Sequence, residues 1–233
     1  MNNLLHQRGF CILDAASVAN WIGSSPNELC SLASDWENMP IDLHLKDGGR
    51  YRRRRHSSFI FENSKLVQAQ HRAHWQPLDY NALHGGMERW FEPVLEQTVC
   101  KSAWIKILSF LAKTSNQMYG KDMKWCIEAH QFRIDTTDGI GRPTPEGAHR
   151  DGVDFVAVFM INRVNIKGGE TRVFDAQSPH GERFTLTQPW SLLLLDDARV
   201  IHESTPIQPL GSSGYRDTLV VTLRANNFQD AIA

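Results

Sequence analysis

The sequence predicts a mainly β protein with flanking helices (α+β), whose core is a double-stranded β-helix, or cupin-like jelly roll. From residue 123 onward, six or seven short strand-like segments are separated by Gly, Pro, Asp and Asn, and this spacing is typical of a sandwich or barrel. Candidate metal-binding side chains lie on or beside the same segments. A chain of 233 residues is also long enough for one closed core. We therefore expect a single domain over residues 1–233, mostly helical at 1–122 and with the jelly-roll core at 123–225.

Before residue 123 the apolar residues mainly recur at helical spacing. Asp14 or Ser17 can cap a first helix, and Gly120 is a suitable residue to end the last one. In chain order we expect a strand at 9–13, helices from about 14 to 22 and 26 to 37, a loop at 62–86, and a helical region at 87–119.

The expected core strands are Lys124–Asp135, Phe155–Asn162, Glu170–Asp175, Arg183–Leu186, Ser191–Leu195, Val200–Ile207 and Thr218–Ala225. Thr136–Gly147 interrupts them and is rich in Gly, Pro and Thr. Its composition is typical of a mobile loop, and we interpret it as a candidate lid.

Composition limits the partners. The formal net charge is −1, which argues against nucleic acid and membrane surfaces as partners. The apolar runs are strand-sized, well short of the roughly 20 residues that a membrane helix needs. The four cysteines form no Cys-x-x-Cys motif, so we interpret them as buried thiols of a cytoplasmic protein. We expect a small-molecule partner, and composition leaves the oligomeric state open.

A candidate metal site lies at His149 and Asp151, just before an apolar strand. Residues two apart on a strand share a face. With a third ligand at His202, two imidazoles and one carboxylate would form a facial triad, which binds non-haem Fe(II) and leaves three positions open. A single His-x-Asp pair is common by chance, so the order of the motifs around it matters.

That order is His-x-Asp, Gly-Gly-Glu-Thr at 168–171, His202, and Arg-x-Thr at 216–218. It resembles the Fe(II)- and 2-oxoglutarate-dependent dioxygenases over roughly residues 128–225, and among them the bacterial free amino-acid hydroxylases such as isoleucine dioxygenase. The resemblance implies Fe(II) bound by the triad, with 2-oxoglutarate and O2 as cosubstrates. It also implies hydroxylation of an unactivated C–H bond in a small molecule, a free L-amino acid or a related carboxylate. The alternative is a cupin-like metal-binding or sensor protein without turnover.

The resemblance also implies that Arg216 and Thr218 bind the distal carboxylate of 2-oxoglutarate. The segment between Pro206 and Arg216 is longer than the family's compact form, which leaves the register of Arg216 open. The alternative for Arg216 is a salt bridge with Asp217. Gln131 shares a strand face with Arg133. Either side chain can bind cosubstrate or substrate, or only satisfy neighbouring polar groups; we predict Gln131 as a further cosubstrate contact.

Substrate contacts are sought among arginines, because a guanidinium binds a carboxylate through two hydrogen bonds. The run at 52–55 enters a strand, which divides its side chains between two faces. Which of the four faces the pocket is left open; Arg53 and Arg55 are our candidates, together with Arg133 and Arg172. His130 is expected to point outward, and His74 is interpreted as a surface residue.

Overall fold

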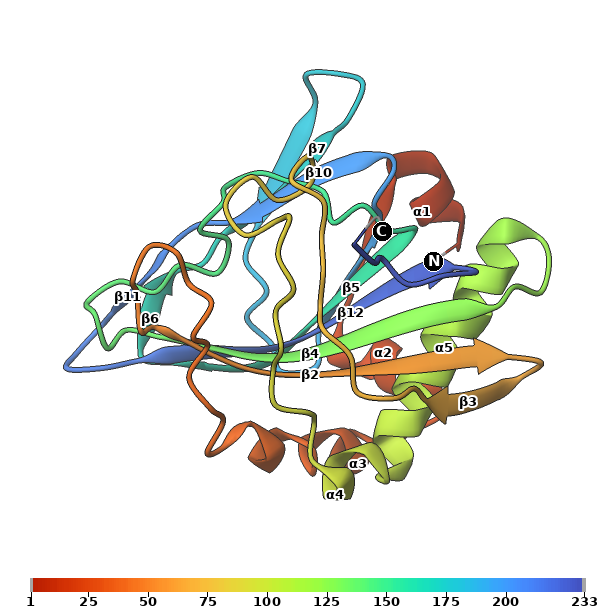
Figure 1. Ribbon diagram of the computed structural model, residues 1–233, viewed down its shortest axis with the longest axis horizontal. Helices are drawn as coiled ribbons and strands as arrows, with labels where there is room; N and C mark the ends of the chain where they lie inside the picture. The colour runs from red at the N-terminus through yellow and green to blue at the C-terminus, as the bar shows by residue number, and fades with distance from the viewer. Residues whose placement is uncertain (1, 232–233) are drawn as a thin grey trace.

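The structure is a computed structural model that describes residues 2–231, and it is built around one large antiparallel sheet (Figure 1). The order across this sheet is β1 (Phe10–Leu13), β9 (Leu192–Asp196), β5 (Phe155–Val164), β12 (Tyr215–Ala225), β4 (Trp125–Asp135), β2 (Arg52–Glu62) and β3 (Lys65–Gln68). The chain is mostly β, as predicted, and the fold is a jelly roll.

Two smaller sheets complete the roll. Their strands are β10 (Val200–Ser204), β7 (Thr171–Asp175) and β8 (Gly181–Phe184), and then β11 (Ile207–Pro209) and β6 (Ile166–Gly168). Val173 of β7 and Val200 of β10 pack against Val156 and Leu193 of the large sheet. Both faces of the large sheet are therefore covered, one of them by strands.

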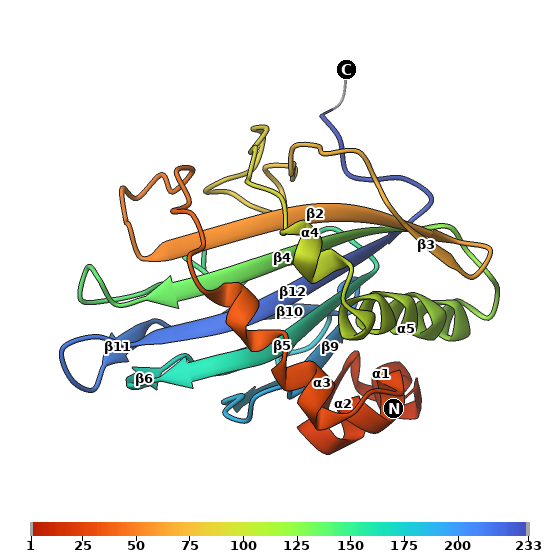
Figure 2. The ribbon, with the colours of Figure 1, turned by 90° about the horizontal axis from the view of Figure 1, so that it is seen from below.

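Helices cover the other face of the large sheet (Figure 2). They are α1 (Asn2–Arg8), α2 (Ala15–Ile22), α3 (Pro26–Cys30), the 3₁₀ helix η1 (Ala33–Trp36), α4 (Glu96–Val99) and α5 (Ser102–Tyr119). Trp104 and Leu108 of α5 are fully buried against Phe59 of β2 and Ile127 of β4. Asp14 caps α2, and Gly120 ends α5 in the left-handed conformation (φ 69°), both as predicted.

Successive side chains of β4 point alternately to the helix-side core and to the opposite face of the sheet. Trp125, Ile127 and Ala129 belong to the helix-side core, so the side chains between them point to the opposite face. That opposite face carries Glu128 and His130, which are buried. A pocket that His130 lines lies on this side.

Four predictions about local structure are wrong. Residues 87–95 form no helix, because Pro93 lacks an amide N–H and disfavours helical geometry at the residue before it. The predicted loop at 62–86 contains β3. Val200–Ile207 is divided into β10 and β11, since Pro206 cannot donate to a ladder. Cys30 and Cys100 are exposed free thiols, whereas Cys11 and Cys126 are buried as expected.

Within residues 2–231, no helix has the length and apolarity to cross a bilayer.

Candidate metal centre and cosubstrate pocket

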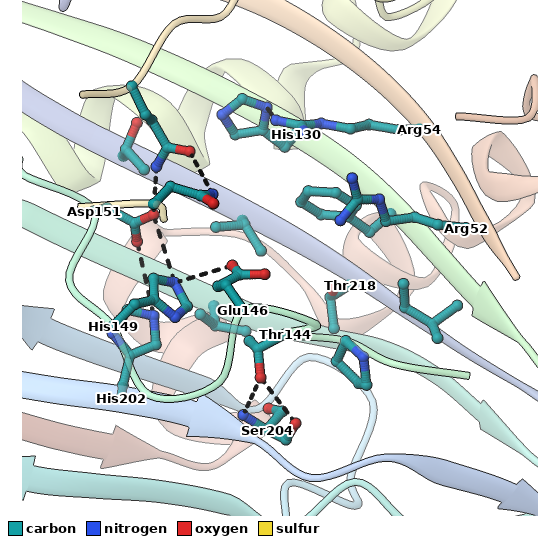
Figure 3. Close-up of a pocket in the computed structure, with 18 of the residues that line it drawn as sticks. Arg52, Arg54, His130, Thr144, Glu146, His149, Asp151, His202, Ser204 and Thr218 are labelled. Atoms are coloured by element: carbon teal, nitrogen blue, oxygen red, sulfur yellow. Dashed lines mark hydrogen bonds and ion pairs between the residues drawn. The ribbon is translucent and has the colours of Figure 1, made fainter. Parts of the chain in front are cut away.

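A short backbone pairing brings the predicted metal ligands together. His149 and His202 exchange two hydrogen bonds, from His149 N to His202 O (3.0 Å) and from His202 N to His149 O (2.9 Å). Their rings lie 4.6 Å apart between centroids. Asp151 follows on the same side, with its oxygens 3.8 Å from His149 Nε2 and 3.7 Å from His202 Nε2 (Figure 3). The potential ligand atoms of all three lie within 4.8 Å of one another.

The histidine rings are oriented to present Nε2. His149 Nδ1 lies 2.9 Å from the Gly147 carbonyl oxygen, and because a carbonyl only accepts, Nδ1 carries the proton. In the neutral ring, Nε2 then has a free lone pair, as metal binding requires. Burial lowers the pKa of His149, but the carboxylates of Asp151 and Glu146 outweigh burial and raise it overall. Burial lowers the pKa of His202 to about 4, so that ring is neutral near pH 7.

The loop that carries Asp151 is held by a second carboxylate, Asp197. This buried side chain accepts hydrogen bonds from Asp151 N (3.0 Å), Gly152 N (2.8 Å) and Val153 N (3.1 Å). Gln76 donates from Nε2 to Asp151 Oδ1 at 3.0 Å. Backbone and side chain of Asp151 are thus both fixed. Neither helper was identified from the sequence, because each comes from a distant turn or loop without a recognisable pattern.

The triad lies at one end of a pocket between the large sheet and the segment before His149 (Figure 3). Arg216 and Thr218 of β12 line this pocket. Arg216 is buried, its Nε has no hydrogen-bond partner, and within residues 2–231 it forms no salt bridge. Burial lowers its pKa to about 10, so the guanidinium is still charged near pH 7. A buried cation without a carboxylate suits an anionic ligand.

Comparison with known proteins is consistent with this geometry. Residues 33–222 match the model of the 2OG-Fe dioxygenase family. The chain belongs to this family.

The solved structures similar to this 2OG-Fe dioxygenase include a bsmA homolog from Methylobium petroleophilum, with 51% identity over 99% of this chain and 94% of that one, and a TM-score of 0.93. IDO from Bacillus thuringiensis is 20% identical over 97% and 98%, with a TM-score of 0.79. The Fe(II)/α-ketoglutarate-dependent dioxygenase TqaL is 19% identical over 96% and 85%, with a TM-score of 0.73. Comparison with curated proteins gives no match.

Family membership establishes the chain as an enzyme that uses Fe(II), 2-oxoglutarate and O2. The residues present fit these groups. Two imidazoles and a carboxylate form the donor set that Fe(II) prefers in this enzyme class. The buried Arg216 offers an unpaired cationic donor in the same pocket. The predicted alternative for Arg216 is wrong, because Asp217 points to the other face and pairs with Arg133 (2.7 Å).

Other candidate contacts of the dioxygenase face away from the pocket. Gln131 and Arg133 lie on the helix side of β4: Gln131 Nε2 donates to the Asp35 carbonyl oxygen (3.4 Å), and Arg133 is held by Asp217. The prediction is wrong because alternate residues of a strand point to opposite faces, and these two residues are in the set that faces the helices. His130, which we expected to point outward, lines the pocket instead.

The prediction for the arginines at 52–55 is wrong in the same way, because the other two side chains of the run face the pocket. Arg53 and Arg55 are on the helix side, where their Nη1 atoms donate to the carbonyl oxygens of Met39 (3.3 Å) and Pro93 (3.1 Å). Arg52 and Arg54 line the pocket. Arg172 is outside it on β7, with Glu170 at 3.0 Å and Glu203 at 3.2 Å.

The segment predicted as a lid is fixed to the roll in this structure. Thr144 Oγ1 donates to Ser204 O (2.9 Å) and accepts from Ser204 N (3.0 Å), while Gly141 pairs with Ile207. Glu146 follows, with Oε1 3.6 Å from His149 Nε2. The segment therefore contributes both a wall and a carboxylate to the pocket (Figure 3).

Asp197→Ala is expected to reduce Fe(II) affinity roughly 10- to 100-fold, the usual cost of losing a group that positions a metal ligand. Three amide N–H groups would lose their acceptor, and the Asp151 backbone would no longer be fixed. Anaerobic Fe(II) titration measures the change. Asp175→Ala, at an exposed acceptor on β7, is the control. Equal affinity in the two variants would contradict the role given to Asp197.

Proposed function

We propose that this dioxygenase hydroxylates an unactivated C–H bond of a free L-amino acid or a related small carboxylate. In this proposal His149, Asp151 and His202 hold Fe(II), and Arg216 with Thr218 binds the distal carboxylate of 2-oxoglutarate. When bound, these groups supply the oxidation: 2-oxoglutarate and O2 are converted to succinate and CO2 as one oxygen atom enters the C–H bond. Family membership favours this enzyme over a metal-binding or sensor protein without turnover.

The observation that carries the proposal is the buried arginine surface of the pocket. Arg54 and Arg89 are both buried and line the pocket, and within residues 2–231 neither forms a salt bridge with a carboxylate. The Nε of each has no hydrogen-bond partner. Arg52 beside them is already paired with Asp42 (2.6 Å). Two buried guanidinium groups with free donors favour a carboxylate on the substrate.

A carboxylate, opposite in charge to the buried arginines, lies beside the triad. Glu146 lines the pocket, and its Oε2 is buried without a partner. Figure 3 shows Glu146 on the His149 side and Arg54 beside His130. A carboxylate at one place and guanidinium groups at another complement a zwitterion, with an ammonium group as well as a carboxylate. These charges support an amino acid over a neutral molecule.

The test is a panel of the twenty L-amino acids with Fe(II), ascorbate and 2-oxoglutarate, in which products are detected by the added mass of one oxygen atom. We expect at least one amino acid to be hydroxylated, and its carboxamide and its decarboxylated amine to react far more slowly. Succinate should form in step with the product. Hydroxylation confined to peptides or to compounds without a carboxylate would contradict the proposal. Omission of 2-oxoglutarate is the blank.

We also propose a cytoplasmic location. All four cysteines are free, and two of them are exposed, as a reducing compartment allows. A reporter fusion followed by cell fractionation tests this assignment.

A further inference from the structure

A second cluster of histidines with one carboxylate lies beside the pocket. His56 of β2 and Glu128 and His130 of β4 point to the pocket side of the sheet, and His74 reaches them from the 69–95 segment. All four side chains are buried, and each offers a nitrogen or oxygen within 4.8 Å of the others. The activity proposed above does not use them directly.

Glu128 fixes two of these rings. Its Oε1 lies 2.9 Å from His56 Nε2 and 3.3 Å from His74 Nδ1. A carboxylate only accepts, so both nitrogens carry protons. Burial lowers the pKa of His56, and that of His74 to about 4. Both rings are therefore neutral near pH 7, each in a single tautomer.

The two fixed rings in turn hold His130. Its ring stacks on His56 at 4.6 Å between centroids and meets the edge of His74 at 4.8 Å. His130 Nδ1 lies 2.9 Å from Nη2 of Arg54. Because a guanidinium only donates, Nδ1 is the acceptor. Figure 3 shows Arg54 reaching the His130 ring.

Two aromatic rings also contact the guanidinium of Arg54. Its guanidinium carbon lies 4.0 Å from the ring centre of Phe91 and 4.6 Å from that of Phe132. Such contacts orient a guanidinium while leaving its edge free to donate. Nε has no partner. The group is fixed in place before any ligand binds.

The cluster of three histidines and Glu128 could either bind a second metal ion or position Arg54. The buried charges around it favour the second role. With neutral histidines, the carboxylate of Glu128 offsets only one of the two buried guanidinium groups, Arg54 and Arg89, so the net charge here is already +1. A divalent cation would raise this buried excess to three positive charges, which is costly. His130 Nδ1 is also already occupied by Arg54.

We propose that Glu128, acting through His56, His74 and His130, positions Arg54 as the guanidinium that binds the substrate's carboxylate. This inference rests on the proposed function. Glu128 has no contact with substrate in this arrangement; it fixes the histidines, and they fix Arg54. Preorganisation of this kind lowers the entropy cost of binding.

The network is tested first without substrate. In protein with ¹⁵N-labelled histidine, NMR should show the proton of His56 on Nε2, that of His74 on Nδ1 and that of His130 on Nε2. The spectrum is then repeated for the His149→Ala variant with one equivalent of Zn²⁺ added. We expect these three signals to stay unchanged. Joint shifts of all three, or different tautomers, would overturn the network and favour a metal site.

The second test uses the amino acid with the highest product yield in the panel. Glu128→Gln should raise its KM roughly tenfold or more, with the KM for 2-oxoglutarate and kcat nearly unchanged. His130→Phe, which keeps a ring but removes the acceptor, should act in the same direction and serves where Glu128→Gln does not fold. Glu203→Gln is the control.

A double-variant cycle shows whether Glu128 acts through Arg54. Once Arg54 is replaced by Met, adding Glu128→Gln should cost little more. Additive losses would overturn the inference even with an amino-acid substrate established. If no amino acid reacts, the proposed function fails, while the NMR result still decides whether the network exists.

Discussion

Asp151→Ala is expected to abolish Fe(II) binding and turnover together. Asp151 is the only carboxylate of the proposed triad, and its oxygens lie 3.8 and 3.7 Å from the two imidazole Nε2 atoms. Its loss would leave the triad with two imidazoles and no carboxylate. Removal of a group that only supports a ligand costs roughly 10- to 100-fold, so loss of a ligand itself should exceed that range. Iron content after desalting and succinate release measure the two effects.

The matched control for this variant is Glu203→Gln. Glu203 is the neighbour of His202 on β10 and pairs with Arg172 outside the pocket. It should retain both iron and activity. Circular dichroism shows whether both variants are folded. Stoichiometric iron with normal turnover in Asp151→Ala would remove the metal assignment.

The convergence of the triad was predictable because it depends on local spacing and motif order. His149 and Asp151 are separated by one residue, and His202 lies in the fifth expected strand after them. A jelly roll brings such positions together through one backbone pairing, here between His149 and His202. The sequence therefore carried enough information for the metal centre.

It was harder to predict which arginines of β2 face the pocket, although the sequence contains a clue. Phe59 and Phe61 belong to the helix-side core, and counting back by twos from them reaches Arg55 and Arg53. The difficulty is that both faces of this sheet are buried. Alternation then gives two sets of side chains without showing which set faces the pocket.

Residues supplied by long loops could not be predicted at all. His74 and Gln76 come from the 69–95 segment, and Glu146 and Asp197 lie in turns. Loops have no period to interpret, and their contacts depend on tertiary packing. These side chains nevertheless hold Asp151 or line the pocket.

Arg216→Met is expected to raise the KM for 2-oxoglutarate roughly 10- to 100-fold while Fe(II) stays bound. The estimate corresponds to losing a charge-assisted hydrogen bond of about 1.5–3 kcal/mol. Arg172→Met is the control, since Arg172 is paired with two glutamates outside the pocket. Kinetics at varied 2-oxoglutarate measure the effect. Unchanged cosubstrate kinetics in Arg216→Met, or equal losses in both variants, would contradict the assignment.

The same substitution should stabilise the ligand-free protein. Arg216 is buried opposite Arg163 in the register of β12 and β5, and Arg163 further lowers its pKa. Methionine removes a buried charge that only a bound anion compensates. Thermal unfolding should therefore show a higher Tm for Arg216→Met without 2-oxoglutarate, by about 2–4 °C for each kcal/mol relieved. Added 2-oxoglutarate should raise the Tm of the wild type but not that of the variant. A lower Tm for the ligand-free variant would mean that Arg216 serves the fold and not the cosubstrate.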